Sequence, residues 1–149
     1  NCDGQLVVAG SSAEMPEFCA AVKQAGGLAK PLAVGGGFHS PFMQKASDAY
    51  LQEIKASEIF APTLPVYANL TAQPYTLEDL PLTLAKQMRR PVLWKQTLQN
   101  MWADGFTTFV EVGPGKTLTG LAKRVLPQAT LFTVQDMDGV QAAASSLQV

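Results

Sequence analysis

Short runs rich in β-branched residues alternate with helical patterns along the chain, and this alternation limits the fold to a small set of architectures. Strand-like runs are expected at residues 5–10, 26–34, 62–74, 107–113 and 130–134, and Pro31 makes the second of them an edge or an interrupted strand. Helical patterns are expected at residues 11–26, 42–54, 76–90, 94–104, 114–126 and 137–147. Alternating elements of this kind favour an α/β fold with a mainly parallel sheet and helices packed on its faces.

Local signals mark several of the expected boundaries. Ser11 and Glu14 have the spacing of a capping box at the start of the first helix. Thr76 with Asp79 is expected to open a later helix, and Pro91 is expected to break or kink it.

Composition excludes several classes of partner. The chain has 149 residues, 47% of them hydrophobic, and a net charge of −1, which predicts one substantial core and no electrostatic preference for nucleic acid or an anionic membrane. No apolar run approaches the length of a membrane span, and residues 1–8 do not resemble a signal peptide. Cys2 and Cys19 lack metal-ligand spacing and are expected as buried or free thiols, so we expect a cytoplasmic protein.

The only histidine, His39, follows three consecutive glycines, Gly35 to Gly37, and Phe38. A lone histidine at the end of an apolar run can simply be packed. Here the glycines remove three side chains just before the ring, which lets backbone or substrate come close to it. The pattern therefore favours a site that another group approaches.

Two motifs resemble catalytic signatures but lack a required residue. The run VEVGPGKTLTG has Val110 where a phosphate-binding loop needs a glycine, so a tight turn with Lys116 at the surface is favoured over a nucleotide site. The run GSSAE has Glu14 where a nucleophile elbow needs a glycine. Capping explains these serines better.

Four segments together carry a family resemblance: GGGFHSPFM, PVYANLTAQP, LAKQMRRPVLW and FVEVGPGKTLTGLAKR, at residues 35–43, 65–74, 84–94 and 109–124. They resemble, in this order and spacing, the C-terminal half of malonyl-CoA:acyl carrier protein transacylases and the acyltransferase domains of fatty acid and polyketide synthases. In that family, a serine on a Gly-His-Ser-x-Gly elbow is acylated by malonyl-CoA. The acyl group then passes to the phosphopantetheine thiol of the carrier protein, and no cofactor or metal is used.

The resemblance also implies a division of the chain. Residues 35–149 would be the C-terminal portion of an α/β-hydrolase-like acyltransferase core, and residues 1–34 the remainder of a ferredoxin-like small subdomain. The family places its nucleophilic serine and its malonyl-binding arginine upstream of this stretch. We therefore expect a fragment, a processed segment, or one piece of a nicked enzyme, that works with a missing N-terminal segment.

The resemblance assigns roles residue by residue. His39 would be the general base, with the main-chain carbonyl of Gln87 accepting the other ring N–H. Phe38, beside the acyl group, is expected to favour malonyl over methylmalonyl. Supporting or substrate-binding roles are expected for Ser40, Asn69 and Asn1, although turn and capping roles suit Ser40 and Asn69 equally well.

An acyl carrier protein, which is acidic in this family, is the expected partner. Two basic clusters could dock it: Lys86, Arg89 and Arg90, and Lys116, Lys123 and Arg124. Each of these residues could equally be ordinary solvated helix surface. The alternative function is a non-catalytic docking or assembly module with the same fold, and a nucleotide-binding module is a third possibility.

Overall fold

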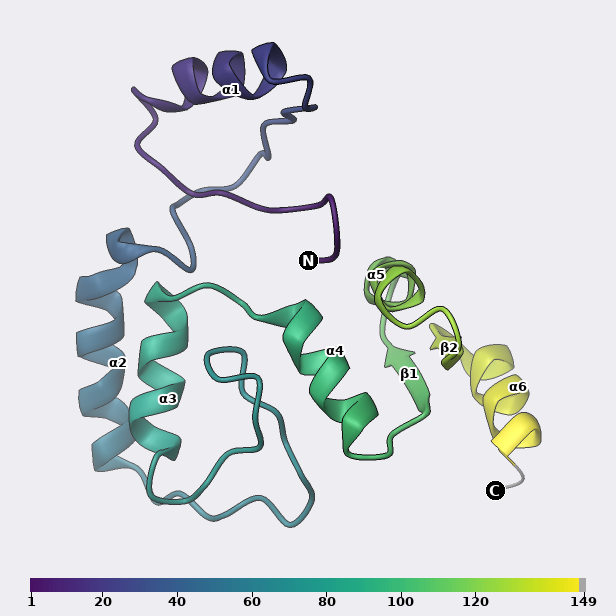
Figure 1. Cartoon of the computed structure of the whole chain (residues 1–149). Helices are drawn as coiled ribbons and strands as arrows, with labels where there is room; N and C mark the ends of the chain where they lie inside the picture. Colours follow the sequence, from purple (N-terminus) through teal and green to yellow (C-terminus); the bar gives the residue numbers. More distant parts are fainter. Residues whose placement is uncertain (148–149) are drawn as a thin grey trace. The chain divides into compact units, whose positions relative to one another are not determined.

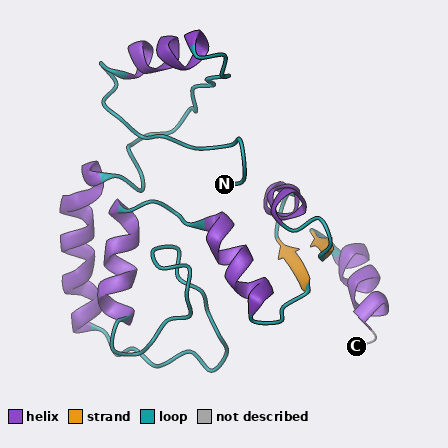
Figure 2. Cartoon of the chain, in the orientation of Figure 1, coloured by secondary structure: helices purple, strands orange, loops and turns teal. Residues whose placement is uncertain are grey.

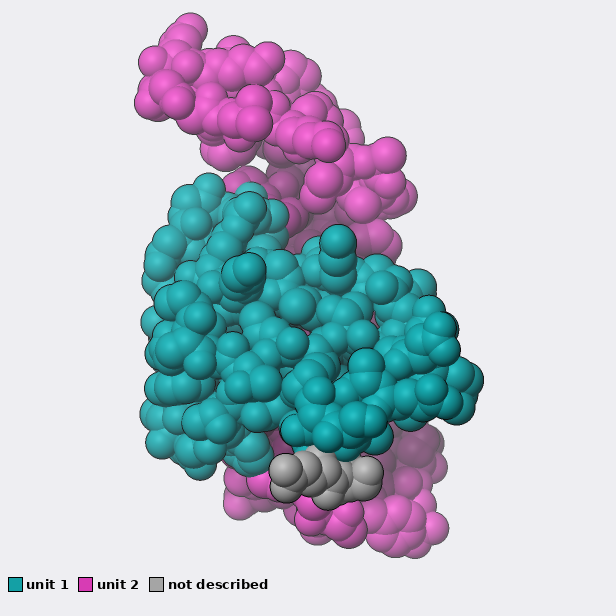
Figure 3. Space-filling view, turned by 90° about the vertical axis from the view of Figure 1, so that its right-hand side faces the viewer, with its two compact units in different colours: residues 1–6, 71–73, 93–149 teal, residues 7–70, 74–92 magenta. Residues whose placement is uncertain are grey.

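The computed structural model describes residues 1–147 and divides the chain into two compact units. Unit 1 comprises residues 1–6, 71–73 and 93–149, and unit 2 comprises residues 7–70 and 74–92 (Figure 3). Helices and a small parallel sheet make up the regular structure, which confirms the expected α/β class (Figure 2). The expected subdomain boundary between residues 34 and 35 stays a prediction.

Unit 2 is helical. It contains α1 (Met15–Gln24), η1 (Pro41–Met43), α2 (Gln44–Ala56), α3 (Leu80–Lys86) and η2 (Gln87–Arg89). Helices α2 and α3 lie side by side (Figure 1). The buried hydroxyl of Ser47 on α2 donates to the main-chain oxygen of Ala85 on α3 at 2.7 Å, so a polar side chain forms part of this helix interface.

Unit 1 contains α4 (Trp94–Ala103), β1 (Thr108–Val112), α5 (Thr117–Val125), β2 (Thr130–Val134) and α6 (Met137–Leu147). Strands β1 and β2 pair in parallel, with Thr108 opposite Thr130 and Val112 opposite Val134. The core of this unit consists of Leu98, Ala122 and Leu126, with partly buried apolar side chains around it: Trp94, Trp102, Phe109, Val125, Ala129 and Leu131.

Three expected strands are wrong. Among the described residues, the runs at 5–10, 26–34 and 62–74 form no ladder, and the bridges that involve them, Cys2–Gln5 and Tyr67–Pro74, are isolated. A strand needs a neighbour that takes up its backbone hydrogen bonds. The expectations came from the apolar composition of these runs. The runs lack a partner strand among the described residues, and Leu6 and Leu28 are accordingly 83% and 91% exposed.

The expected capping box is also wrong. Helix α1 begins at Met15 after Glu14, whose side chain makes no capping hydrogen bond. The Ser11 hydroxyl instead accepts from the N–H of Ala13 at 3.3 Å, two residues along the chain. A serine that binds its own turn in this way competes with the helix start that its spacing suggests.

Other local expectations are confirmed. Asp79 donates its N–H to the Thr76 hydroxyl at 3.3 Å just before α3, and the helical run ends before Pro91. Both cysteines are free, and Cys2 is buried. Within the described residues, every helix is too short or too polar to cross a bilayer.

Candidate functional site

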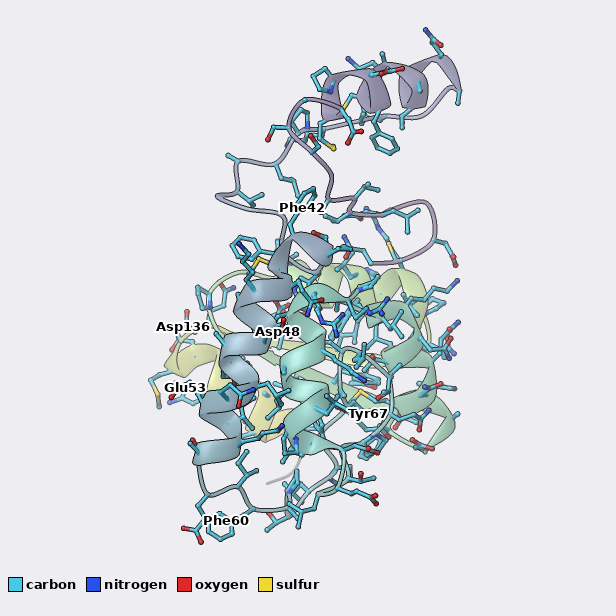
Figure 4. All side chains as sticks on the ribbon, turned by 90° about the vertical axis from the view of Figure 1, so that its left-hand side faces the viewer. Phe42, Asp48, Glu53, Phe60, Tyr67 and Asp136 are labelled. Atoms are coloured by element: carbon cyan, nitrogen blue, oxygen red, sulfur yellow. The ribbon has the colours of Figure 1, made fainter. Side chains whose placement is uncertain are left out.

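The loop that carries His39 is a compact turn in unit 2. The Ser40 hydroxyl donates to the main-chain oxygen of Gly37 at 2.5 Å and accepts from the N–H of Phe42 at 3.3 Å. Phe42, labelled in Figure 4, belongs to η1, which leads directly into α2. Ser40 is buried and caps η1, so the structure gives it the turn role.

Gly37 is the glycine of the triplet that this turn requires. A Cβ at Gly37 would lie 2.9 Å from Cδ2 of Phe42 and 3.1 Å from the Ser40 hydroxyl, which leaves no room for a side chain. At Gly35 a Cβ would meet nothing within 4 Å. The close approach therefore involves the loop's own residues at Gly37.

His39 has a backbone conformation that non-glycine residues rarely adopt, with a φ of 57°. Such a conformation costs about 1–3 kcal/mol and persists where neighbouring contacts hold it. Here the N–H of His39 donates to the main-chain oxygen of Met88 at 3.0 Å. The left-handed turn presents an exposed imidazole while its backbone is fixed to η2.

The ring of His39 is oriented by a peptide group. Its Nδ1 lies 2.8 Å from the main-chain oxygen of Gln87, 48 residues away. A carbonyl oxygen only accepts, so the neutral ring carries its hydrogen on Nδ1 and leaves Nε2 with a free lone pair. The arrangement suits a general base, because Nε2 can take a proton while the carbonyl stabilises the resulting imidazolium.

Gln87 also uses its side chain. Its Oε1 accepts a hydrogen bond from the phenol of Tyr75 at 3.1 Å. Burial raises the pKa of Tyr75, and the nearby Tyr50 raises it further, while the bond to Gln87 lowers it; the net direction is upward. The phenol therefore stays protonated at neutral pH and remains a donor.

The other expected site residues differ in burial and in the unit that contains them. Phe38 precedes His39 and is 54% exposed. Asn69 is half-buried in a turn of unit 2. Asn1 is half-buried in unit 1, a different unit from the one that holds His39.

The first basic cluster is not uniformly available for docking. Lys86 and Arg89 are half-buried, and Nε of Arg89 is buried without a hydrogen-bond partner among the described residues. Arg90, in contrast, is exposed.

In the second basic cluster, Lys116 and Lys123 are exposed. Arg124 donates to Oε1 of Gln5 at 3.1 Å and so has a role within unit 1.

A carboxylate of this chain binds the start of α5, just after the glycine turn that follows β1. The carboxylate of Glu111 accepts from the N–H groups of Leu118 and Thr119 at 3.1 and 2.7 Å, and from the Thr119 hydroxyl at 2.6 Å. These are amides at the start of α5 that a bound phosphate would need. An internal carboxylate takes the place of an external anion, in line with the missing glycine of the motif.

Two contributing residues were not expected from the sequence: Tyr75, which contacts Gln87, and Ser47, which joins α2 to α3. Ser47 carried a weak signal, since a serine on the inward side of an amphipathic helix needs a partner. Tyr75 follows a turn, and no local pattern connects it with Gln87. Among the described residues, no group of three or more His, Cys, Asp or Glu could hold a metal ion.

Comparisons with known proteins identify the family of this chain. The family model described as "Acyl transferase domain" matches residues 1–145. The chain is 33% identical over 150 residues to malonyl CoA-acyl carrier protein transacylase of Bacillus subtilis, covering 99% of this chain and 47% of that protein. It is 37% identical over 139 residues to the protein of the same name from Synechocystis, covering 93% of this chain and 47% of that one.

Solved structures give the same result. The chain superimposes on malonyl CoA-acyl carrier protein transacylase from Clostridium perfringens with a TM-score of 0.86 and 28% identity, covering 90% of this chain and 43% of that one. For a malonyl-transacylase in complex with its type II PKS acyl-carrier protein, the TM-score is 0.88 at 29% identity, covering 92% and 45%. The chain spans about half the length of the curated relatives it matches.

Proposed function

Because the chain belongs to the acyl transferase domain family, we propose that it forms the histidine-bearing part of an enzyme that transfers malonyl from CoA to acyl carrier protein. The observation that carries the proposal is the 2.8 Å contact between Nδ1 of His39 and the main-chain oxygen of Gln87. This contact leaves Nε2 as the basic atom of an exposed ring. An acyl transfer through an activated hydroxyl needs a base of this kind.

In the proposed reaction, the nucleophile is a serine in a segment outside this chain. Nε2 of His39 takes the serine proton as the oxygen attacks the malonyl thioester, and the imidazolium returns that proton to the departing CoA thiolate. In the second half, His39 takes the proton of the carrier's phosphopantetheine thiol, whose sulfur attacks the acyl-serine. The imidazolium then protonates the released serine oxygen. No metal or cofactor takes part in these steps.

The proposed fold follows the same division. Residues 35–149 would be part of an α/β-hydrolase-like core, and residues 1–34 part of a ferredoxin-like subdomain completed by the missing N-terminal segment. Exposed apolar side chains support this proposal: Leu6, Val7, Leu28 and Val34 lie in runs with strand-like composition and no ladder among the described residues. Strands from the absent segment would cover such side chains.

Substrate contacts are proposed for Phe38, Asn69 and Asn1, with Ser40 supporting the turn. Carrier docking is proposed for the exposed cations of the two basic clusters, Arg90, Lys116 and Lys123 above all, since an acidic partner is attracted to cations that are free to meet it. Two free thiols fit a reducing compartment, so we place the activity in the cytoplasm.

The test is malonyl transfer by the intact protein after substitution of His39. His39→Ala should lower the rate by about a hundredfold or more, the usual scale for a lost acid-base group. His39→Asn is the second variant, because asparagine tolerates the left-handed backbone of this residue and separates lost chemistry from backbone strain. A near-normal rate in both folded variants would favour the alternative, a non-catalytic docking module.

A further inference from the structure

Tyr75 is fixed at both its backbone and its side chain. Its N–H donates to the main-chain oxygen of Val66 at 2.9 Å, beside the bridge between Tyr67 and Pro74. Its half-buried ring ends in the phenol that donates to Oε1 of Gln87 at 3.1 Å. The turn at residues 66–75 therefore holds a donor against the residue that orients the histidine ring.

Gln87 lies where the helix α3 gives way to the tighter turn η2. The last carbonyls of a helix lack partners within the helix, and their direction changes easily when the final turn rearranges. At this end, the Gln87 and Met88 oxygens receive hydrogen bonds from the ring and the backbone of His39. The direction of the Gln87 carbonyl thus depends on what holds η2 in place.

We propose that Tyr75 is a positioning residue for His39: by holding the Gln87 side chain, its phenol keeps the Gln87 carbonyl directed at Nδ1. The effect of Tyr75 on catalysis rests on the proposed function. The coupling of Tyr75 to the histidine ring does not depend on that function and can be measured separately. Ser47 also ties α3 to α2 through the main-chain oxygen of Ala85, so the two contacts together restrain the end of α3.

The single histidine makes this coupling measurable without an activity assay. In the 149-residue chain, ring nitrogen signals in long-range ¹⁵N–¹H correlation spectra come from His39 alone. The full chain should show the neutral ring with its hydrogen on Nδ1. In Tyr75→Phe, the ratio of the Nδ1–H to the Nε2–H tautomer should fall about two- to tenfold, the range expected for one net hydrogen bond.

Gln87→Leu removes the same hydrogen bond from its other end and keeps the main-chain carbonyl, so it should shift the tautomer ratio in the same direction. The double variant should shift it no further than the larger single effect, because both substitutions remove one interaction. Tyr50→Phe is the matched control, since it removes the hydroxyl of a neighbouring, exposed tyrosine. Its tautomer ratio should equal that of the unsubstituted chain.

In the intact protein, Tyr75→Phe should lower kcat for transfer while leaving KM for the acyl-CoA nearly unchanged, since the residue acts through His39 rather than on the substrate. An unchanged tautomer ratio in folded Tyr75→Phe would overturn the inference. Should that variant fail to fold, as judged by circular dichroism, Gln87→Leu decides the question by the same measurement. Full activity of the His39 variants would refute the proposed function and leave the tautomer result to decide this inference separately.

Discussion

The buried hydroxyl of Ser47 donates to the main-chain oxygen of Ala85 across 2.7 Å and joins α2 to α3. His39 lies a short turn before α2, and Gln87 directly follows α3. This hydrogen bond therefore helps to hold together the two segments that meet at the histidine ring.

Ser47→Ala should lower the free energy of unfolding by about 0.5–1.5 kcal/mol, because it removes a buried hydrogen bond to the Ala85 oxygen, which keeps the N–H of Gln87 as a donor. Ser57→Ala is the matched control, since the Ser57 hydroxyl also donates to a main-chain oxygen, that of Glu53, but is exposed. Its effect should stay within about 0.5 kcal/mol. Urea unfolding followed by circular dichroism measures both, and equal effects would contradict a special role for the Ser47 contact.

Gly37→Ala should disrupt the histidine turn, whereas Gly35→Ala should not. The new Cβ at residue 37 would lie 2.9 Å from the Phe42 ring, and relieving such a clash costs about 1–3 kcal/mol. At residue 35 the added methyl meets nothing within 4 Å. Comparing the His39 ring signals by NMR tests this, and an unperturbed ring in Gly37→Ala would show that the turn tolerates a side chain.

Phe38→Ala should weaken discrimination between malonyl-CoA and methylmalonyl-CoA in the intact protein. A pocket distinguishes one methyl group by about 1–3 kcal/mol, so we expect a preference for malonyl rather than exclusive use of it. The measurement is the ratio of kcat/KM values when the two substrates compete. If the unsubstituted enzyme uses both equally, Phe38 does not select the acyl group.

Arg90→Glu should raise the apparent KM for carrier protein and leave hydrolysis of malonyl-CoA unchanged, with an effect that shrinks as salt increases. Arg90 is a cleaner choice than Arg89, whose Nε is buried. Lys55→Glu at the exposed end of α2 makes the same charge change and serves as the control. Equal effects of the two reversals would indicate general electrostatics and not docking at Arg90.

Glu111 should make the stability of unit 1 sensitive to acid. Two hydrogen bonds from Thr119 hold the pKa of Glu111 below its ordinary value of 4.5, and the one from the hydroxyl has a larger effect than the one from the N–H. The folded state therefore prefers the ionised carboxylate, so its stabilisation is present above the unfolded pKa and is lost as the pH falls through the folded value.

Glu111→Gln should accordingly be less stable than the unsubstituted chain at neutral pH, and the difference should shrink on acidification. Both tryptophans lie on α4 and pack against the unit 1 core, so their fluorescence during urea unfolding follows this unit. A stability difference that does not change with pH would show that the carboxylate's charge is unimportant.

Sequence patterns correctly predicted the elements whose packing partners lie within this chain. The strands at 108–112 and 130–134 and the helix at 117–125 were all expected from periodicity and turn residues, and each has its neighbour within this chain. The runs at 5–10 and 26–34 have similar composition but no partner strand among the described residues. Composition indicates that a segment can pair, whereas pairing depends on a second segment.

The candidate site divides in the same way. His39 stood out from its glycine context, and its contact with Gln87 was expected only through the family resemblance, because 48 residues separate the two. The phenol of Tyr75 was not expected at all. Its contact with Gln87 depends on how the turn at 66–75 folds back, which no short sequence pattern describes.

The acceptor that orients His39 is a peptide oxygen, and this determines what genetics can reveal about the site. Every residue that replaces Gln87 supplies the same oxygen, so alanine scanning reports only on the side chain and would undervalue the position. Replacing the amide that joins Gln87 to Met88 with an ester, by chemical synthesis, would weaken the oxygen while leaving every side chain in place. For the same reason, another residue at position 87 would still supply the oxygen, provided that other contacts keep its peptide group directed at Nδ1.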